Sequence, residues 1–358
     1  MRRVPPFLVV AVAGWVQGAQ DHAHTMTMSM PMTLAEGMVT ASVQDLRSRR
    51  ELVIDLPGQD LPAGMSHDEH AMMAMGLPPV AVATIPEDVW LYGFRVDMVD
   101  GAGRSIPGVV LHHLNVSTPE SRELFLPIQR RLLAAGQETG EQRAPWLLFG
   151  TPLAKGERLV INSMMMNPTK QSYRGAHPRL VLYYVPGGRP WPLFRTYPWQ
   201  LDCAFPVGDK SWTLPPGHSQ HSYEGSPAVP GTIVAIGGHL HEYGIRLTFM
   251  DATTGNVIWS VTPDTDAAGH VQSLPVGKLF SLTRLGAHID PSHRYRVTAE
   301  YENPTGVAIP EGAMGVVGGL FRPDRGFVWP RADTTGELYR QDLRHYLRLS
   351  AGTEHTHH

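Results

Sequence analysis

The segment TIVAIGGHLHEYGIRLTF, residues 232–249, decides the fold class. Its β-branched and aromatic residues around a glycine-rich centre read as a run of β-strand rather than helix. On a strand, residues i and i+2 point to the same face, so His239 and His241 can present two imidazoles to one point. Imidazole is a common ligand of copper and zinc. The spacing therefore predicts a metal site, the alternative being two solvent-facing histidines at a sheet edge.

Composition and patterning indicate an all-β protein. The 358 residues are enough for two domains, and a hydrophobic content of 42% allows sizeable cores. From about residue 86 onward, short strand-like runs alternate with Gly and Pro, which favours two tandem jelly-roll β-sandwich domains. The net charge of −3 gives no basis for a nucleic-acid partner.

The N-terminus resembles an export signal. Arg2 and Arg3 precede a short apolar run over 7–16, which is too short for a transmembrane helix of about 20 residues. An uncleaved membrane anchor is the alternative. We expect a periplasmic or secreted protein without a transmembrane helix after cleavage. The predicted boundaries are a signal peptide at 1–20, a Met/His-rich flexible segment at 21–85, a first sandwich at 86–202, a second sandwich at 203–345 and a His-containing tail at 346–358.

Local patterns add three expectations. The run 251–256 has the turn chemistry of a β-hairpin. The run 126–135 is helix-like, although Pro127 lies near its start. Asn-Pro-Thr ends two strand-like runs, at 167–169 and at 303–305, which fits two domains of one architecture or a chance tripeptide.

Methionine and histidine are concentrated near the ends of the chain. More than half of the 16 methionines lie between Met26 and Met75, in clusters at 22–32 and 65–75, and the C-terminus ends in a histidine-rich run. Thioethers favour Cu(I), and imidazole suits both copper oxidation states. Short His-rich tracts commonly bind metal. These segments predict copper capture, with a low-complexity spacer as the alternative.

The chain has one cysteine, Cys203, so a disulfide within the chain is impossible. Cys203 is either a small buried hydrophobe or a thiolate ligand.

Further candidate ligands lie on other strand-like runs. Met314 stands among glycines, where the backbone can pass close to a ligand. His112 and His113 are adjacent, so both can reach one metal only at a bulge or a strand end. Met164 and Met166 share a strand face and could supply a third donor.

Taken together, these motifs resemble the copper type II, ascorbate-dependent monooxygenases. The resemblance covers roughly 89–321, and it is best in the second half, where the runs 238–244, 301–304 and 312–315 follow the family's order. It implies two eight-stranded jelly-roll domains with one copper each. The chain lacks the many disulfides of the family's best-known enzymes and has no clear counterpart of their substrate pockets.

The resemblance also implies roles for the candidate ligands. It places His239, His241 and Met314 on the copper that binds oxygen, and His112 and His113 on the copper that supplies electrons. Where the family has a third histidine at the latter site, this chain has methionines, Met164 being the first candidate and Met166 the second.

Three functions remain open from the sequence. The first is an exported copper monooxygenase that hydroxylates a C–H bond with O2 and a reductant such as ascorbate. The alternative is a non-catalytic copper-handling protein for storage, resistance or delivery. The third is a metal-free β-sandwich binding module with a surface of Trp191, Trp199 and Trp212. No role is assigned to His218, His221, His270 or His288.

Overall fold

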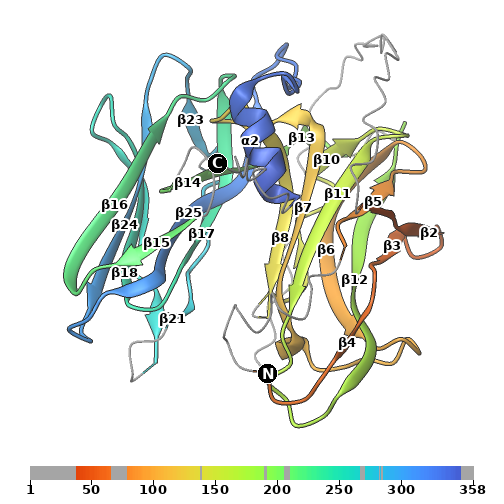
Figure 1. The fold of residues 1–358 in the computed structure, drawn as a ribbon. Helices are drawn as coiled ribbons and strands as arrows, with labels where there is room; N and C mark the ends of the chain where they lie inside the picture. The colour runs from red at the N-terminus through yellow and green to blue at the C-terminus, as the bar shows by residue number, and fades with distance from the viewer. Residues whose placement is uncertain are drawn as a thin grey trace, which may run out of the picture. The chain divides into compact units, whose positions relative to one another are not determined.

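The computed structural model describes residues 38–65, 79–137, 139–188, 192–204, 210–266, 271–281, 283 and 285–347. These residues are mostly in β-strands, which confirms the all-β class (Figure 1). The predicted signal peptide, the methionine- and histidine-rich runs at 22–32 and 66–75, and the tail from 348 onward lie outside the described residues.

Two sheets form the half of the chain that we call the first sandwich. One has the order β1 (Val39–Thr40), β5 (Ala81–Thr84), β11 (Arg158–Met165), β7 (Leu111–Arg122) and β8 (Gln129–Gly136). The other has the order β13 (Phe194–Arg195), β10 (Phe149–Leu153), β6 (Val89–Val99), β12 (Tyr173–Pro186), β3 (Glu51–Asp55) and β2 (Ser42–Leu46). β4 (Gln59–Leu61) joins β12, β9 (Gln142–Arg143) joins β6, and a 3-10 turn, η1 (Gly108–Val110), precedes β7.

Two further sheets form the second sandwich. One has the order β14 (Tyr197–Asp202), β25 (Ile309–Pro323), β17 (Gly231–Leu240) and β22 (Gly277–Lys278), with β15 (Ser211–Leu214) on β25 and β23 (Ala287–Ile289) on β17. The other has the order β16 (Gly217–Gly225), β24 (Tyr295–Asn303), β18 (Gly244–Asp251) and β19 (Val257–Val261). β20 (Asp264–Thr265) pairs with β21 (Val271–Ser273), and the helix α2 (Glu337–Tyr346) follows.

The two sandwiches share one topology. The order β5-β11-β7-β8 of the first sandwich matches β16-β24-β18-β19 of the second, and β10-β6-β12-β3 matches β23-β17-β25-β14. Short strands also correspond, since β4 pairs with β12 as β15 pairs with β25. The second sandwich therefore repeats the first. This strand order supports the finer description of each half as a jelly roll, which remains a prediction within the confirmed class.

Each sandwich encloses its own core, but one loop of the first sandwich lies in the core of the second. The connection between β7 and β8 contributes Leu124, Phe125, Leu126 and Ile128 to the second core. The ring of Phe125 packs on Trp199, with ring centroids 5.3 Å apart. The helix expected over 126–135 is wrong, because the apolar residues at its start are buried by the second sandwich and the rest forms β8, which pairs with β7.

The predicted boundaries need correction at three places. Strands β1 to β4 lie within 39–61 and β5 lies at 81–84, so these parts of the segment expected to be flexible belong to the first sandwich. β14 pairs with β25, which moves the start of the second sandwich from residue 203 to about 197. Helix α2 contacts the first sandwich, where the Tyr346 hydroxyl donates to the carbonyls of Asn115 (2.8 Å) and Val160 (3.0 Å).

The hairpin predicted around 251–256 is confirmed. β18 and β19 are adjacent antiparallel strands, and the Asp251 N–H donates to the Asn256 carbonyl at 2.8 Å.

Candidate metal centres

The two histidines of the second sandwich lie where β17 ends. His239 is on β17 and pairs with Val316 of β25, and His241 follows directly after Leu240, the last residue of the strand. The two ring centroids are 5.3 Å apart, and the rings are nearly perpendicular. The sequence prediction that these imidazoles come together is consistent with this geometry.

The chain passes from one sheet to the other immediately after His241. The residues 232–249 form two strands, β17 and β18, which belong to different sheets, rather than one continuous strand. Tyr243 adopts a left-handed conformation with φ of 63°, and the Gly244 N–H donates to the His241 carbonyl at 3.2 Å. The turn therefore holds the backbone of His241 at the edge of the sandwich.

Met314 approaches the same place from β25. The pairs His239–Val316 and Leu240–Gly315 place His241 next in register opposite Met314. Residues two apart on a strand share a face, so Met314 lies on the outer face with Val316 and His239. His239 is exposed, while His241 and Met314 are half-buried. We call His239, His241 and Met314 the second-sandwich site.

A glycine makes this close approach feasible. At Gly238, a Cβ atom would lie 2.3 Å from the Leu247 side chain and 2.7 Å from the Val316 carbonyl oxygen. No side chain fits between the strand and the core here, so Gly238 lets β17 lie close to its neighbours beside the two histidines.

The adjacent histidines of the first sandwich lie at a β-bulge near the start of β7. His113 pairs with Met164 and Leu111 pairs with Met165, so His112 and His113 together face one residue of β11. A bulge re-aims neighbouring side chains that would otherwise point to opposite faces. The ring centroids of His112 and His113 are 5.2 Å apart. The structure therefore supplies the bulge that the adjacent pair requires.

Of the two methionines considered as third donor, the geometry favours Met164. It is the cross-strand partner of His113 and is half-buried. Met166 lies beyond the end of β11, with 2% of its surface exposed, and its N–H donates to the Val110 carbonyl at 2.9 Å. We call His112, His113 and Met164 the first-sandwich site.

The two sites do not occupy equivalent positions of the repeat. The bulge recurs in β18, where Arg246 pairs with Glu300 as His113 pairs with Met164. An ion pair with an N···O distance of 4.0 Å thus takes the place of the imidazole and thioether. Ile245 stands at the position of the other histidine. Duplication alone therefore does not explain why both halves carry a His/Met set.

Both donor sets fit a soft or borderline metal ion such as copper. A metal about 2.0 Å from a nitrogen of each ring, at a tetrahedral angle, would hold the ring centroids roughly 5 Å apart. The separations of 5.3 and 5.2 Å agree with this. In the part of the chain that the structure describes, no three His, Cys, Asp or Glu side chains form a metal-binding group. Strand register brings Met164 opposite His113 and Met314 next to His241, and a thioether is a donor that Cu(I) accepts.

One phenol links the two segments of the second-sandwich site. The Tyr301 hydroxyl accepts the N–H of His241 at 3.1 Å and the N–H of Met314 at 3.0 Å, and it donates to the Met314 carbonyl. Tyr301 belongs to the run 301–304 of the sequence, which by itself indicates no role for this residue. Only the long-range pairing of β24 with β18 reveals it.

Cys203 is not suited to metal binding. It is buried, and its N–H donates to the Gly315 carbonyl at 2.7 Å. Burial raises the pKa of the thiol, and the neighbouring Asp202 raises it further. The thiol therefore stays protonated at neutral pH, which leaves the reading of a small buried hydrophobe.

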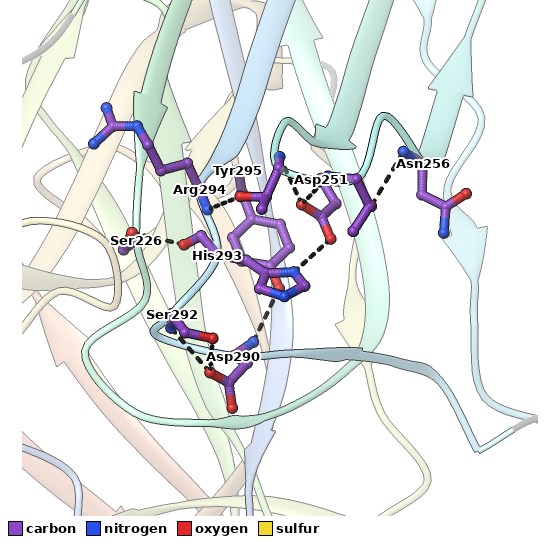
Figure 2. A network of polar contacts seen from close by, with 10 residues as sticks. Ser226, Asp251, Asn256, Asp290, Ser292, His293, Arg294 and Tyr295 are labelled. Atoms are coloured by element: carbon purple, nitrogen blue, oxygen red, sulfur yellow. Dashed lines mark hydrogen bonds and ion pairs between the residues drawn. The ribbon is translucent and has the colours of Figure 1, made fainter.

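Other histidines and tryptophans lie in structural contacts. Figure 2 shows His293 pointing at Asp251, with Nδ1 2.7 Å from a carboxylate oxygen, in the network that ties the β18–β19 turn to the residues before β24. His221 stacks on Trp212. Trp199 is buried in the second core, so the surface expected from Trp191, Trp199 and Trp212 does not form as proposed, and Trp191 lies outside the described residues.

Comparisons with known proteins do not identify the chain. No protein-family profile matches it, and no curated protein matches it. A solved structure of a protein from Eubacterium rectale, presumed to be secreted, aligns with 70% of this chain and 71% of its own at 6% identity and a TM-score of 0.24. The VP2 subviral particle of infectious bursal disease virus aligns with 81% of this chain and 72% of its own at 11% identity and a TM-score of 0.24. Such scores carry no argument about fold or function.

Among the described residues, no helix has the length and apolar character needed to span a membrane.

Proposed function

We propose that the protein is an exported copper protein whose second-sandwich site supports a monooxygenase reaction. One observation carries this proposal: in each sandwich, a strand places two imidazoles about 5 Å apart beside a strand that carries a methionine. The resemblance to copper type II, ascorbate-dependent monooxygenases supports the same assignment from motif order.

The second-sandwich site would hold the copper that reacts with oxygen. His239 and His241 would ligate through neutral ring nitrogens, and Met314 would add a thioether that favours Cu(I). The exposure of His239 leaves room for a small molecule at the site. Copper bound there would supply one-electron redox chemistry and a position for O2.

The proposed reaction consumes one O2 molecule, two electrons and two protons for each substrate molecule. One oxygen atom of O2 enters a C–H bond of the substrate, and the other leaves as water. A reductant such as ascorbate supplies the two electrons and two protons that this requires. The first-sandwich site would take up electrons, its imidazoles coming from β7 and its thioether from β11.

A copper-handling protein without turnover is the second candidate. The cross-strand pairing of His113 with Met164 favours it, because a thioether in place of an imidazole stabilises Cu(I) and hinders cycling to Cu(II). The Met- and His-rich runs of the sequence are consistent with this role.

The first experiment counts copper. The full chain is loaded with copper under reducing conditions and dialysed, alongside His239→Ala, His113→Ala and the control His221→Ala. Retained copper that falls by one ion per molecule in either site variant and is unchanged in the control would support both sites, whatever the Met- and His-rich runs add to the total. If all variants retain the same amount of copper as wild type, the assignment of the two sites is wrong, and the copper is bound elsewhere in the chain.

The second experiment separates the two candidates. Oxygen uptake with excess ascorbate is measured for copper-loaded wild type and His241→Ala across a panel of C–H substrates, with product analysis for incorporated oxygen. Substrate-dependent uptake lost in the variant supports the monooxygenase. Tight copper binding without such uptake supports copper handling.

A further inference from the structure

The hydroxyl of Tyr301 takes the place of a strand partner where β17 leaves β25. The ladder between these strands runs to the pair Leu240–Gly315. At the next position, the N–H groups of His241 and Met314 both donate to the phenol oxygen rather than to a facing carbonyl. The phenol proton is donated to the Met314 carbonyl. One oxygen atom thus satisfies three backbone groups of the two ligand-bearing segments.

We infer that Tyr301 is a positioning residue that sets the separation of His241 from Met314, and thereby decides whether the thioether and the imidazoles can share one metal. This inference rests on the proposed function, because it assigns a role in the second-sandwich site. Tyr301 acts through the backbone, since its hydroxyl forms hydrogen bonds with backbone groups of His241 and Met314 and not with their side chains.

The surroundings of Tyr301 suit it to this role. Its side chain is fully buried, and its ring packs edge-on against Trp212 with centroids 6.0 Å apart. Burial raises the pKa of the phenol to about 12, although the hydrogen bonds from Met314 and His241 oppose the shift. The same oxygen donates one hydrogen bond and accepts two. The packing of the core sets the position of the Tyr301 ring.

The repeat gives an internal comparison. Tyr301 pairs with Gly244 just before the bulge of β18, as Met165 pairs with Leu111 at the bulge of β7. Met165 has no hydroxyl, and the strands β6 and β12, which are the counterparts of β17 and β25, carry neither of the two candidate sites. The phenol is present in the half where β17 and β25 carry the candidate ligands.

The same strand offers a matched control. Tyr295 also lies on β24, is buried, and accepts one backbone N–H, from Asp290 at 2.9 Å. Tyr295→Phe therefore removes a buried phenol and a backbone hydrogen bond at a position that contacts neither His241 nor Met314.

The experiment compares Tyr301→Phe with Tyr295→Phe in full-length protein carrying His112→Ala and His113→Ala, so that one core site remains. Cu(I) affinity is measured by competition with a chromogenic chelator, the copper–sulfur distance by X-ray absorption, and the melting of the metal-free protein by calorimetry. We expect Tyr301→Phe to weaken Cu(I) binding about 10- to 100-fold, as loss of a supporting hydrogen bond does elsewhere, and to lose the copper–sulfur signal while nitrogen scattering persists. Tyr295→Phe should keep both.

Each outcome decides the inference. Unchanged affinity and sulfur signal in a folded Tyr301→Phe variant would overturn it and leave the proposed function standing. Copper binding by the parent that does not change when His239→Ala is added would instead overturn the proposed function. If Tyr301→Phe does not fold, a fluorinated tyrosine at position 301 keeps the shape and weakens the phenol as an acceptor. A shifted sulfur signal then supports the inference, and an unshifted one overturns it.

Discussion

Asn167 and Asn303 make the same set of hydrogen bonds in the two sandwiches. Each amide nitrogen donates to the carbonyls of a Leu-Pro pair and of a residue four positions on, namely Leu61, Pro62 and Gln171 for Asn167 and Leu214, Pro215 and Val307 for Asn303. Each amide oxygen accepts the N–H and hydroxyl of a threonine two positions on. The Asn-Pro-Thr echo of the sequence is thus a repeated structural device, not a chance tripeptide.

Because the two asparagines make the same hydrogen bonds, we expect their removal to lower the stability of the protein by similar amounts. Asn167→Ala and Asn303→Ala should each lower the free energy of unfolding by roughly 2–4 kcal/mol, because each buried carbonyl that loses its donor costs about 1–3 kcal/mol. Urea unfolding checks the values, with the exposed Asn256→Ala as control. A penalty in one half only would show that the two asparagines are not energetically equivalent.

The recurring bulge predicts that the first-sandwich site can be copied. Ile245→His, Arg246→His and Glu300→Met would place the same three donors on β18 and β24. Arg246 is exposed, and its N···O distance to the half-buried Glu300 is 4.0 Å, so loss of this ion pair should cost less than about 1 kcal/mol. We expect one additional copper ion per molecule by elemental analysis. A folded triple variant with no extra copper would mean that the shared bulge does not suffice.

Met164 should govern the redox preference of the first-sandwich site. Met164→His replaces a thioether with an imidazole, which should lower the reduction potential of bound copper and strengthen Cu(II) binding. Redox titration of protein carrying His239→Ala isolates this copper. Met166→Leu is the matched control, because Met166 is buried beyond the end of β11 and should leave the potential unchanged. An effect from Met166 instead would reassign the third donor.

Acid should weaken the contact between Asp251 and His293. Burial alone would raise the pKa of Asp251, but hydrogen bonds from His293, Thr253 and Thr254 outweigh it and hold the pKa below its ordinary value. A carboxyl whose pKa is lower in the folded state stabilises the fold above its unfolded pKa of about 3.9, and this contribution disappears as pH falls through the folded value.

The corresponding measurement is the free energy of unfolding of wild type and Asp251→Asn from about pH 5 to pH 2. The difference in the free energy of unfolding between wild type and Asp251→Asn should become smaller as the pH falls. Asp264→Asn, at an exposed position, controls for the loss of one carboxylate. A gap that does not change with pH would show that ionisation of Asp251 contributes nothing to stability.

The sequence predicted the all-β class, but it did not predict where all the strands lie or how they pair. Alternating branched residues around His239 and His241 are a local signal, and so is the turn at 251–256. The bulge at His112 depends on how β7 pairs with β11, which is a long-range property. The run 126–135 was misjudged because the second core, formed much later in the chain, buries Phe125 and overrides local helix preference.

The role of Tyr301 was likewise invisible to local reasoning. A tyrosine on the inward face of a strand normally reads as core, and Tyr301 is core by burial. Its hydroxyl matters only because β24 brings it beneath the ends of two strands from the other sheet. The strands β3 and β4 were missed for a related reason, since both pair with β12, more than a hundred residues further along the chain.

The single thiol of the chain can report local opening of the second sandwich. The buried Cys203 packs against Gly315, which follows Met314 in the sequence. A Cβ atom added to Gly315 would lie 2.8 Å from the Cys203 sulfur. A thiol reagent can react only when this part of the second sandwich opens, and no other cysteine contributes to the signal. The rate of alkylation therefore measures how often the part of the second sandwich that carries Met314 opens, without an attached probe.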